Sequence, residues 1–291
     1  MHDQAVSIHG LRLHYRTWGD ADQSGLDIVL VHGLSSASHI WDLVAPQLAE
    51  AHRVLAVDQR GHGESDQPES GYDFPSIVSD LHGVLSAANV RLPALLVGHS
   101  WGASVVVRYA AEHPSAVAGL ALVDGGIGSP GENWSWEETL ERLTPPDIDG
   151  LPWDELRQRM TEANPLFAEP RVEAIGRSLF HIRTDARVER RLRIPNHLRI
   201  LRALWEERPA EHLARVRSPV LVLPARQPSD PPERLETKAR NVARAKAIQP
   251  RVRVRWFEDT IHDVPLQRPD ELAAELRTFA VELFSQAEQE V

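Results

Sequence analysis

Short apolar runs recur along this chain, and most of them are followed by a stretch with helical periodicity. They occupy residues 28–31, 54–57, 95–97, 117–123 and 219–223. A strand that is apolar on both faces must be covered on both faces, which is the situation in a parallel sheet with helices on either side. The pattern therefore predicts an α/β fold with a mostly parallel, twisted sheet.

Other segments show a regular alternation or a helical stripe. Residues 11–19 alternate as a half-buried strand would, and residues 252–257 alternate as an edge strand would. Apolar positions recur at helical spacing over 40–51, 75–89 and 233–248. The last predicted helix carries one apolar stripe, made by Leu272, Leu276, Phe279 and Leu283. These helices are expected to cover both faces of the sheet.

The pattern changes between residues 128 and 213, where prolines interrupt short helical stretches and no strand-like apolar run occurs. Ser135 and Glu138 form a capping-box pattern for one helix, and Asn196 is expected to cap another. We therefore predict a core domain made of residues 1–127 and 214–291. A helical cap domain, residues 128–213, is expected to lie over the carboxyl edge of the sheet, where α/β folds bind ligands.

The most informative stretch is Gly98-His99-Ser100-Trp101-Gly102, which lies between an apolar run and a helical pattern. In a strand–turn–helix context, G-x-S-x-G places the serine on a strained turn with its hydroxyl exposed, and the glycines let strand and helix approach closely. The N–H groups at the start of the helix point toward any oxyanion that forms there. Ser100 is therefore the candidate nucleophile.

A serine hydroxyl is a poor nucleophile at neutral pH and needs a base to accept its proton. His262 lies in the loop between the last predicted strand and the last helix. That is the position expected of the base when the catalytic residues follow the order serine, acid, histidine. His262 is therefore the candidate base.

Composition excludes several other classes of site. The formal net charge of −10 argues against nucleic acid and anionic membranes as partners, because both need a basic surface. The chain has no cysteine, and it lacks the motifs of zinc, phosphate-loop and dinucleotide sites, so we expect no metal and no cofactor. No signal peptide or membrane-spanning run is evident at the sequence level, which makes a cytoplasmic location the expectation.

Together, these motifs resemble those of the α/β-hydrolase fold family, in particular its members with a helical cap. His32-Gly33-Leu34 matches the family's H-G-x oxyanion loop, and residues 58–65 match its D-x-R-G-x-G-x-S loop, to which we assign no catalytic role. Residues 98–102 match its nucleophile elbow, and His262 with Pro265 matches its late H-x-x-P. The motifs occur in the family's order and span nearly the whole chain. The resemblance implies a Ser-His-acid triad and an oxyanion hole made by the backbone N–H groups of Leu34 and Trp101.

The catalytic acid departs from the commonest pattern of the family. Relatives usually carry an aspartate in a G-x-x-D turn after the strand that follows the cap, but here the run at 219–223 continues into Pro224-Ala225-Arg226-Gln227-Pro228. Asp124, at the end of the preceding strand, is our favoured acid, because a subset of the family that includes haloalkane dehalogenases and some lactonases carries its acid there. Asp230 and Asp263 remain alternatives.

The expected activity is hydrolysis of a carboxylic ester or lactone through an acyl-enzyme intermediate. Hydrolysis of C–C bonds or amides, perhydrolysis, and a non-catalytic binding role remain alternatives. The expected partner is a small-molecule substrate with an apolar part, and the protein is expected to be a monomer or homodimer. Candidate substrate-binding residues are His32, Trp101, Trp134, Trp136 and Trp153, although packing of the cap onto the core would also explain any single tryptophan there.

Overall fold

A computed structural model describes residues 1–20 and 22–289, and it is organised around one eight-stranded sheet. The strand order is β1-β2-β4-β3-β5-β6-β9-β10. β1 and β2 pair antiparallel, as do β2 and β4, and all other neighbours are parallel. The strands are β1 (His2–Ile8), β2 (Leu11–Trp18), β3 (Ile28–Val31), β4 (Val54–Val57), β5 (Ala94–His99), β6 (Val117–Val123), β9 (Val220–Leu223) and β10 (Val252–Val254).

Every apolar run of the sequence lies in a buried strand of the parallel part of the sheet, which confirms the predicted fold class. The antiparallel edge of the sheet is where sequence and structure differ. β1 is absent from the sequence-based prediction, because its sequence is polar and an exposed edge strand needs no apolar face. The prediction of a half-buried β2 is wrong, since the strand is buried from Leu13 to Trp18 and its polar Arg16 pairs with Asp3 and Asp42.

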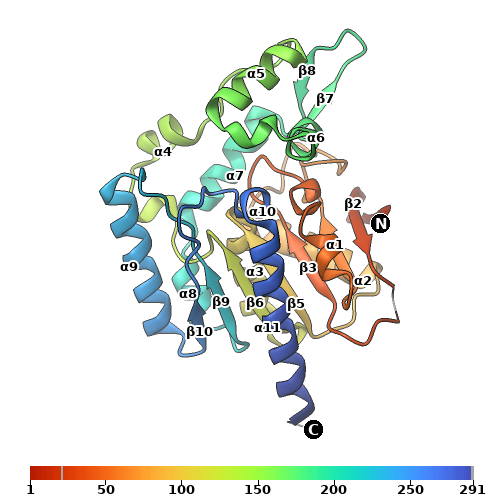
Figure 1. The fold of residues 1–291 in the computed structure, drawn as a ribbon, viewed down its shortest axis with the longest axis vertical. Helices are drawn as coiled ribbons and strands as arrows, with labels where there is room; N and C mark the ends of the chain where they lie inside the picture. Colours follow the sequence, from red (N-terminus) through yellow and green to blue (C-terminus); the bar gives the residue numbers. More distant parts are fainter. Residues whose placement is uncertain (21, 290–291) are drawn as a thin grey trace.

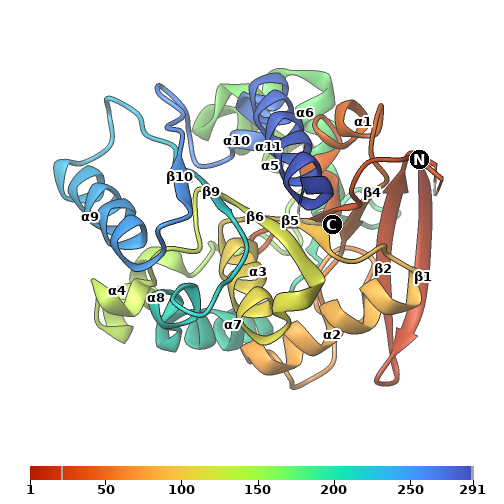
Figure 2. The ribbon, with the colours of Figure 1, turned by 90° about the horizontal axis from the view of Figure 1, so that it is seen from below.

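Helices cover both faces of the sheet (Figure 2). The apolar residues of α1 (Ala45–Leu48) and α11 (Pro269–Gln289) belong to the cluster on one face. Those of α2 (Phe74–Ala87), α3 (Trp101–Glu112), α8 (Pro209–Leu213) and α9 (Pro232–Ile248) belong to the cluster on the other. None of the helices that the structure describes is long and apolar enough to cross a membrane.

The segment between β6 and α8 lies at one end of the molecule, at the top of Figure 1. It contacts the loops that follow β3 and β4: His197 pairs with Ser35, and Asn196 donates to Tyr72. It also contains a small hairpin that the sequence pattern does not predict. Its elements are η3 (Pro130–Glu132), α4 (Trp136–Leu143), α5 (Trp153–Ala163), η4 (Pro165–Ala168), α6 (Pro170–Ser178), β7 (Phe180–Ile182), β8 (Val188–Arg190) and α7 (Ile194–Glu206).

The two predicted helix caps in this segment have different outcomes. The capping box is present, since Ser135 Oγ accepts from the N–H of Glu138 while the Glu138 carboxylate accepts from the N–H of Ser135. The prediction for Asn196 is wrong, because α7 begins two residues earlier, at Ile194. Pro195 is accommodated in the first turn of the helix, where its missing N–H costs nothing.

Candidate active site

Ser100 stands at the sharp turn between β5 and α3. Its backbone has φ 54° and ψ −120°, a conformation that non-glycine residues rarely adopt. The turn is held by a 2.9 Å hydrogen bond from the N–H of Ser100 to the carbonyl of Val123. A Cβ on Gly98 would lie 2.4 Å from the carbonyl oxygen of Gly102, so strand and helix can approach only because that position is glycine. The sequence motif has the local geometry of a nucleophile elbow.

The loop after β3 passes directly beside Ser100. A Cβ on Gly33 would lie 3.0 Å from Cβ of Ser100, and Leu34 is the next residue. Within residues 1–20 and 22–289, the N–H groups of Leu34 and Trp101 donate to no protein acceptor. Two unpaired donors next to the serine hydroxyl are the arrangement that an oxyanion needs.

His262 and Asp124 come together although 138 residues separate them. Nδ1 of His262 lies 2.6 Å from Oδ2 of Asp124. The histidine side chain is 41% exposed and the aspartate side chain only 2% exposed, so one end of the pair reaches solvent and the other is buried. Asp124 follows β6 and has a positive φ of 45°, which turns its side chain out of the strand direction.

The residue before Ser100 also contacts His262. Nε2 of His99 lies 3.0 Å from the carbonyl oxygen of His262, and the two rings are 4.9 Å apart between centroids. No hydrogen bond joins Ser100 Oγ to His262 among the described side chains. Such a contact is often long in a ligand-free enzyme and tightens when substrate binds. His262 thus lies beside the elbow with its Nε2 unpaired in the same set of residues.

The Asp124 carboxylate has two further partners. Its Oδ1 accepts from the backbone N–H of Ala225 at 2.9 Å and from Nζ of Lys238 at 2.7 Å. Burial raises the pKa of Asp124, but the hydrogen bond from His262 and the positive charges of His262 and Lys238 outweigh burial and hold the pKa below its usual range. Asp124 is therefore ionised at neutral pH. Sequence reasoning missed Lys238; the only signal was its rarity, because Lys246 is the one other lysine in an arginine-rich chain.

The alternative acids have different surroundings. Oδ2 of Asp230 accepts from the N–H of Gln227 at 2.9 Å, and Oδ1 lies 3.4 Å from Arg234. Asp263 precedes the short helix α10 (Val264–Gln267) as its cap residue. Neither carboxylate is hydrogen-bonded to His262 in the part of the chain that the structure describes. The observed partner of His262 is Asp124.

The two candidate substrate-binding residues of the core, His32 and Trp101, have side chains that are almost fully buried. His32 is fully buried; its Nδ1 lies 2.7 Å from the Gly33 carbonyl, and its Nε2 accepts from the N–H of Gln59 at 3.1 Å. Trp101 is 2% exposed and stacks on His62, with 5.5 Å between ring centroids. Both rings support the loops around Ser100 from within the core.

The three tryptophans of the inserted segment lie in two separate places. Trp134 and Trp136 both contact Trp205 of α7, the first through its carbonyl oxygen and the second edge-on through its ring. Trp153 is buried in a small cluster of its own and packs against Phe180. These contacts account for the tryptophans by packing, and the structure does not bring the three together at Ser100.

A cavity of about 430 Å³ adjoins His262 on the side facing α9. One wall is the 260–263 loop, one is α9 with Arg234 and Lys238, and one is the turn at 163–165 of the inserted segment. This volume is within the range of small-molecule sites. His262 therefore borders open space, whereas Asp124 and Ser100 are not among the residues that line this cavity.

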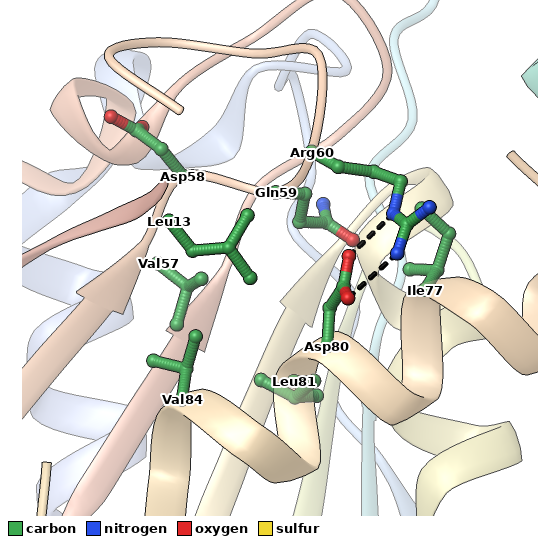
Figure 3. A pocket seen from close by; sticks show the side chains of 9 residues that line it. All are labelled: Leu13, Val57, Asp58, Gln59, Arg60, Ile77, Asp80, Leu81 and Val84. Carbon is green, nitrogen blue, oxygen red and sulfur yellow. Dashed lines mark hydrogen bonds and ion pairs between the residues drawn. The ribbon is translucent and has the colours of Figure 1, made fainter. Parts of the chain in front are cut away.

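The loop at 58–65 is structural. The Arg60 guanidinium pairs with both carboxylate oxygens of Asp80 on α2, as Figure 3 shows. The small cavity drawn there holds about 10 Å³, which is no more than one water requires. Asp58 accepts from the N–H groups of Ser38 and Glu64, so its carboxylate ties together the loops that follow β3 and β4.

Comparison with known proteins agrees with the fold. Residues 28–275 match the model of the alpha/beta hydrolase family. The chain belongs to this family. It is 36% identical over 135 residues to epoxide hydrolase B of Mycobacterium tuberculosis, covering 43% of this chain and 38% of the relative. It is 38% identical over 116 residues to a non-heme chloroperoxidase of Streptomyces lividans, covering 39% and 41%.

Among solved structures, E-2-(acetamidomethylene)succinate hydrolase superposes on this alpha/beta hydrolase with a TM-score of 0.76 at 22% identity, covering 95% of this chain and 98% of the other. This similarity shows the fold. The chain spans about two fifths of the length of the curated relatives it matches. The names of these relatives differ in chemistry, so the reaction must be inferred from the site itself.

Proposed function

We propose that this alpha/beta hydrolase is a serine hydrolase that cleaves a carboxylic ester or lactone. The observation that carries the proposal is the 2.6 Å hydrogen bond between His262 and Asp124 beside the Ser100 elbow. An ionised carboxylate on Nδ1 keeps the proton there, which leaves Nε2 free to accept the proton of the serine hydroxyl. We assign Ser100 as nucleophile, His262 as general base and acid, and Asp124 as the acid of the triad.

The reaction proceeds in two steps. Ser100 Oγ attacks the carbonyl carbon while His262 takes the hydroxyl proton, and the N–H groups of Leu34 and Trp101 bind the oxyanion. Collapse of the tetrahedral intermediate expels the alcohol, which receives the proton from His262. Water, deprotonated by His262, then attacks the acyl-enzyme; the second tetrahedral intermediate releases the acid while His262 returns the proton to Ser100 Oγ. A lactone follows the same course, with the alcohol and the acid remaining in one molecule.

The serine at the elbow distinguishes this proposal from the chemistry that one relative's name indicates. The epoxide hydrolases and dehalogenases of this family use an aspartate as nucleophile, whereas the residue at the elbow here is Ser100. Cleavage of amides or C–C bonds and perhydrolysis would use the same triad and oxyanion hole. We further propose that residues 128–213 form a cap over the site, because this segment contacts the loop that carries Leu34 through Ser35.

A series of p-nitrophenyl esters, from acetate to decanoate, tests the proposal with wild type and Ser100→Ala prepared in parallel. Turnover by the wild type that vanishes in Ser100→Ala supports the serine mechanism, and the preferred chain length gives the size of the acyl site. If the two proteins behave alike, ester hydrolysis through Ser100 is wrong. A panel of lactones, amides and β-diketones then distinguishes the related activities.

A further inference from the structure

Lys238 makes an unusually complete set of contacts with the candidate acid. Its Nζ lies 2.7 Å from Oδ1 and 2.9 Å from Oδ2 of Asp124, and 2.6 Å from the carbonyl oxygen of Ala225. An ammonium group has three N–H donors, so these three acceptors use all of them. Lys238 therefore has no donor left for a substrate, although its side chain borders the cavity next to His262.

The contacts tie together three separate parts of the fold. Asp124 follows β6, Ala225 follows β9, and Lys238 lies in the second turn of α9. The Ala225 N–H also donates to Oδ1 of Asp124 at 2.9 Å. The side chain of Lys238 is 19% exposed and that of Asp124 is 2% exposed, so solvent screens the ion pair only weakly. A carboxylate that is buried to this degree needs such partners to remain ionised and in one orientation.

We propose that Lys238 is a positioning residue of the triad, which holds the Asp124 carboxylate in place against His262 and balances part of its charge. This inference rests on the proposed function, and it adds Lys238 to the three triad residues as a fourth, positively charged residue. The mechanism is electrostatic as well as geometric. The ammonium partly neutralises the Asp124 carboxylate, so its removal changes the electric field at the neighbouring imidazole.

Among the described residues, the charged or titratable side chains that contact the Asp124 carboxylate are Lys238 and His262. From β5, His99 faces the His262 ring, and burial, followed by the charge of His262, lowers the pKa of His99 to about 4, so it is neutral. Across the cavity, Asp230 and Arg234 pair with each other. Asp263 adjoins His262 in sequence and carries the opposite sign. Lys238 is thus the cation that contacts the acid directly.

The test measures two quantities in wild type, Lys238→Met, Lys238→Arg and Lys246→Met. One is the pH midpoint at which the His262 ring titrates in NMR spectra, with its signal assigned by its loss in His262→Gln. The other is the pH dependence of labelling at Ser100 by a fluorophosphonate, with Ser100→Ala as the blank. Lys246 is the other lysine of the chain, is exposed on the same helix, and makes a matched control.

Lys238→Met should raise the His262 midpoint by about one pH unit, because a neighbouring positive charge is removed. The acid limb of the labelling profile should move with it, and the labelling rate should fall about tenfold because the carboxylate loses a fixed partner. Lys238→Arg should keep the midpoint near that of the wild type while still losing rate. Lys246→Met should match the wild type in both measurements. A purely structural lysine would change stability without moving the midpoint.

The outcomes separate the inference from the proposed function. If Ser100 is labelled but Lys238→Met has the wild-type midpoint, the inference is wrong and the serine hydrolase remains. If the midpoint moves but Ser100 is never labelled, Lys238 does tune His262 while the proposed function fails. If Lys238→Met does not fold, Lys238→Arg is the deciding variant. A His262 midpoint displaced by as much as one pH unit in Lys238→Arg, although the positive charge is retained, would contradict the electrostatic role of Lys238.

Discussion

The identity of the triad acid is the prediction with the largest expected effect. In Asp124→Asn, the amide can still accept from the N–H of Ala225 and from Lys238 through its oxygen. The other end of the amide is an NH2 group, which would face Nδ1 of His262 at 2.6 Å. Two donors cannot share that short contact, so the imidazole must carry its proton on Nε2 instead. Nε2 then has no lone pair to accept the proton of Ser100.

The size of the effect follows from the population of the productive tautomer and the lost stabilisation of the imidazolium. Replacing the triad aspartate of a serine protease by asparagine lowers kcat by about 10⁴, and we expect a loss of about 10³ to 10⁴ here. At about 1.36 kcal/mol for each factor of ten, this corresponds to about 4 to 5.5 kcal/mol of transition-state stabilisation. Stability should also decrease, by about 3 kcal/mol, because Lys238 is left as a largely buried charge without its counter-ion.

The assay is the initial rate on the best p-nitrophenyl ester, with chemical denaturation run on the same preparations. Asp230→Asn is the matched control, since its carboxylate caps a turn through the N–H of Gln227 and should leave the rate within about twofold. Near-normal activity in Asp124→Asn, with an inactive Asp230→Asn, would refute the assignment. Loss of activity in both variants would show that Asp230 also contributes to the rate and is no neutral control.

Three other predictions concern the elbow, the inserted segment and pH. Gly102→Ala should cost about 3 kcal/mol in urea unfolding, because its Cβ would lie 2.4 Å from the backbone oxygen of Val31; a loss below about 1 kcal/mol would contradict this close approach. His197→Ala should lower kcat about tenfold with little change in KM. Nδ1 of His197 accepts from Ser35 Oγ at 2.9 Å, and its Nε2 donates to the Leu143 carbonyl at 3.0 Å. Activity equal to that of the wild type would show that this contact does not position the loop that carries Ser35. The free energy of unfolding should decrease as the pH is lowered from about 7.5 to about 5.5, because burial lowers the pKa of several histidines in the folded state while the unfolded chain takes up protons below about pH 6.5. The loss is about 1 kcal/mol for each fully buried ring at about pH 5.5, and thermal melts that do not change over this range would contradict it. The fully buried histidines are His32, His62 with its pKa lowered to about 3, and His99 with its pKa lowered to about 4.

Local patterns determined most of the architecture of this protein. The continuous apolar runs mark the parallel strands because a strand buried on both faces cannot carry polar side chains. The elbow is also determined locally, because the strand, the serine and the helix are neighbours in sequence. Gly98 and Gly102 allow the close backbone approaches at this turn. The position of His262 beside the elbow could be predicted from its place in the order of motifs along the chain. β1 escaped detection because an exposed edge strand places few demands on side-chain polarity.

The tertiary structure alone decided which charged residues meet. Asp124, Asp230 and Asp263 all lie near the end of a strand or in the loop that carries His262, and sequence spacing does not tell which carboxylate faces the ring. The fold brings Asp124 to His262 across 138 residues, and α9 brings Lys238 to the same carboxylate. Similarly, Trp153 packs in a cluster of its own, apart from Trp134. A hydrogen bond depends on positions within a few tenths of an ångström, and these arise from the packing of whole elements rather than from any local pattern.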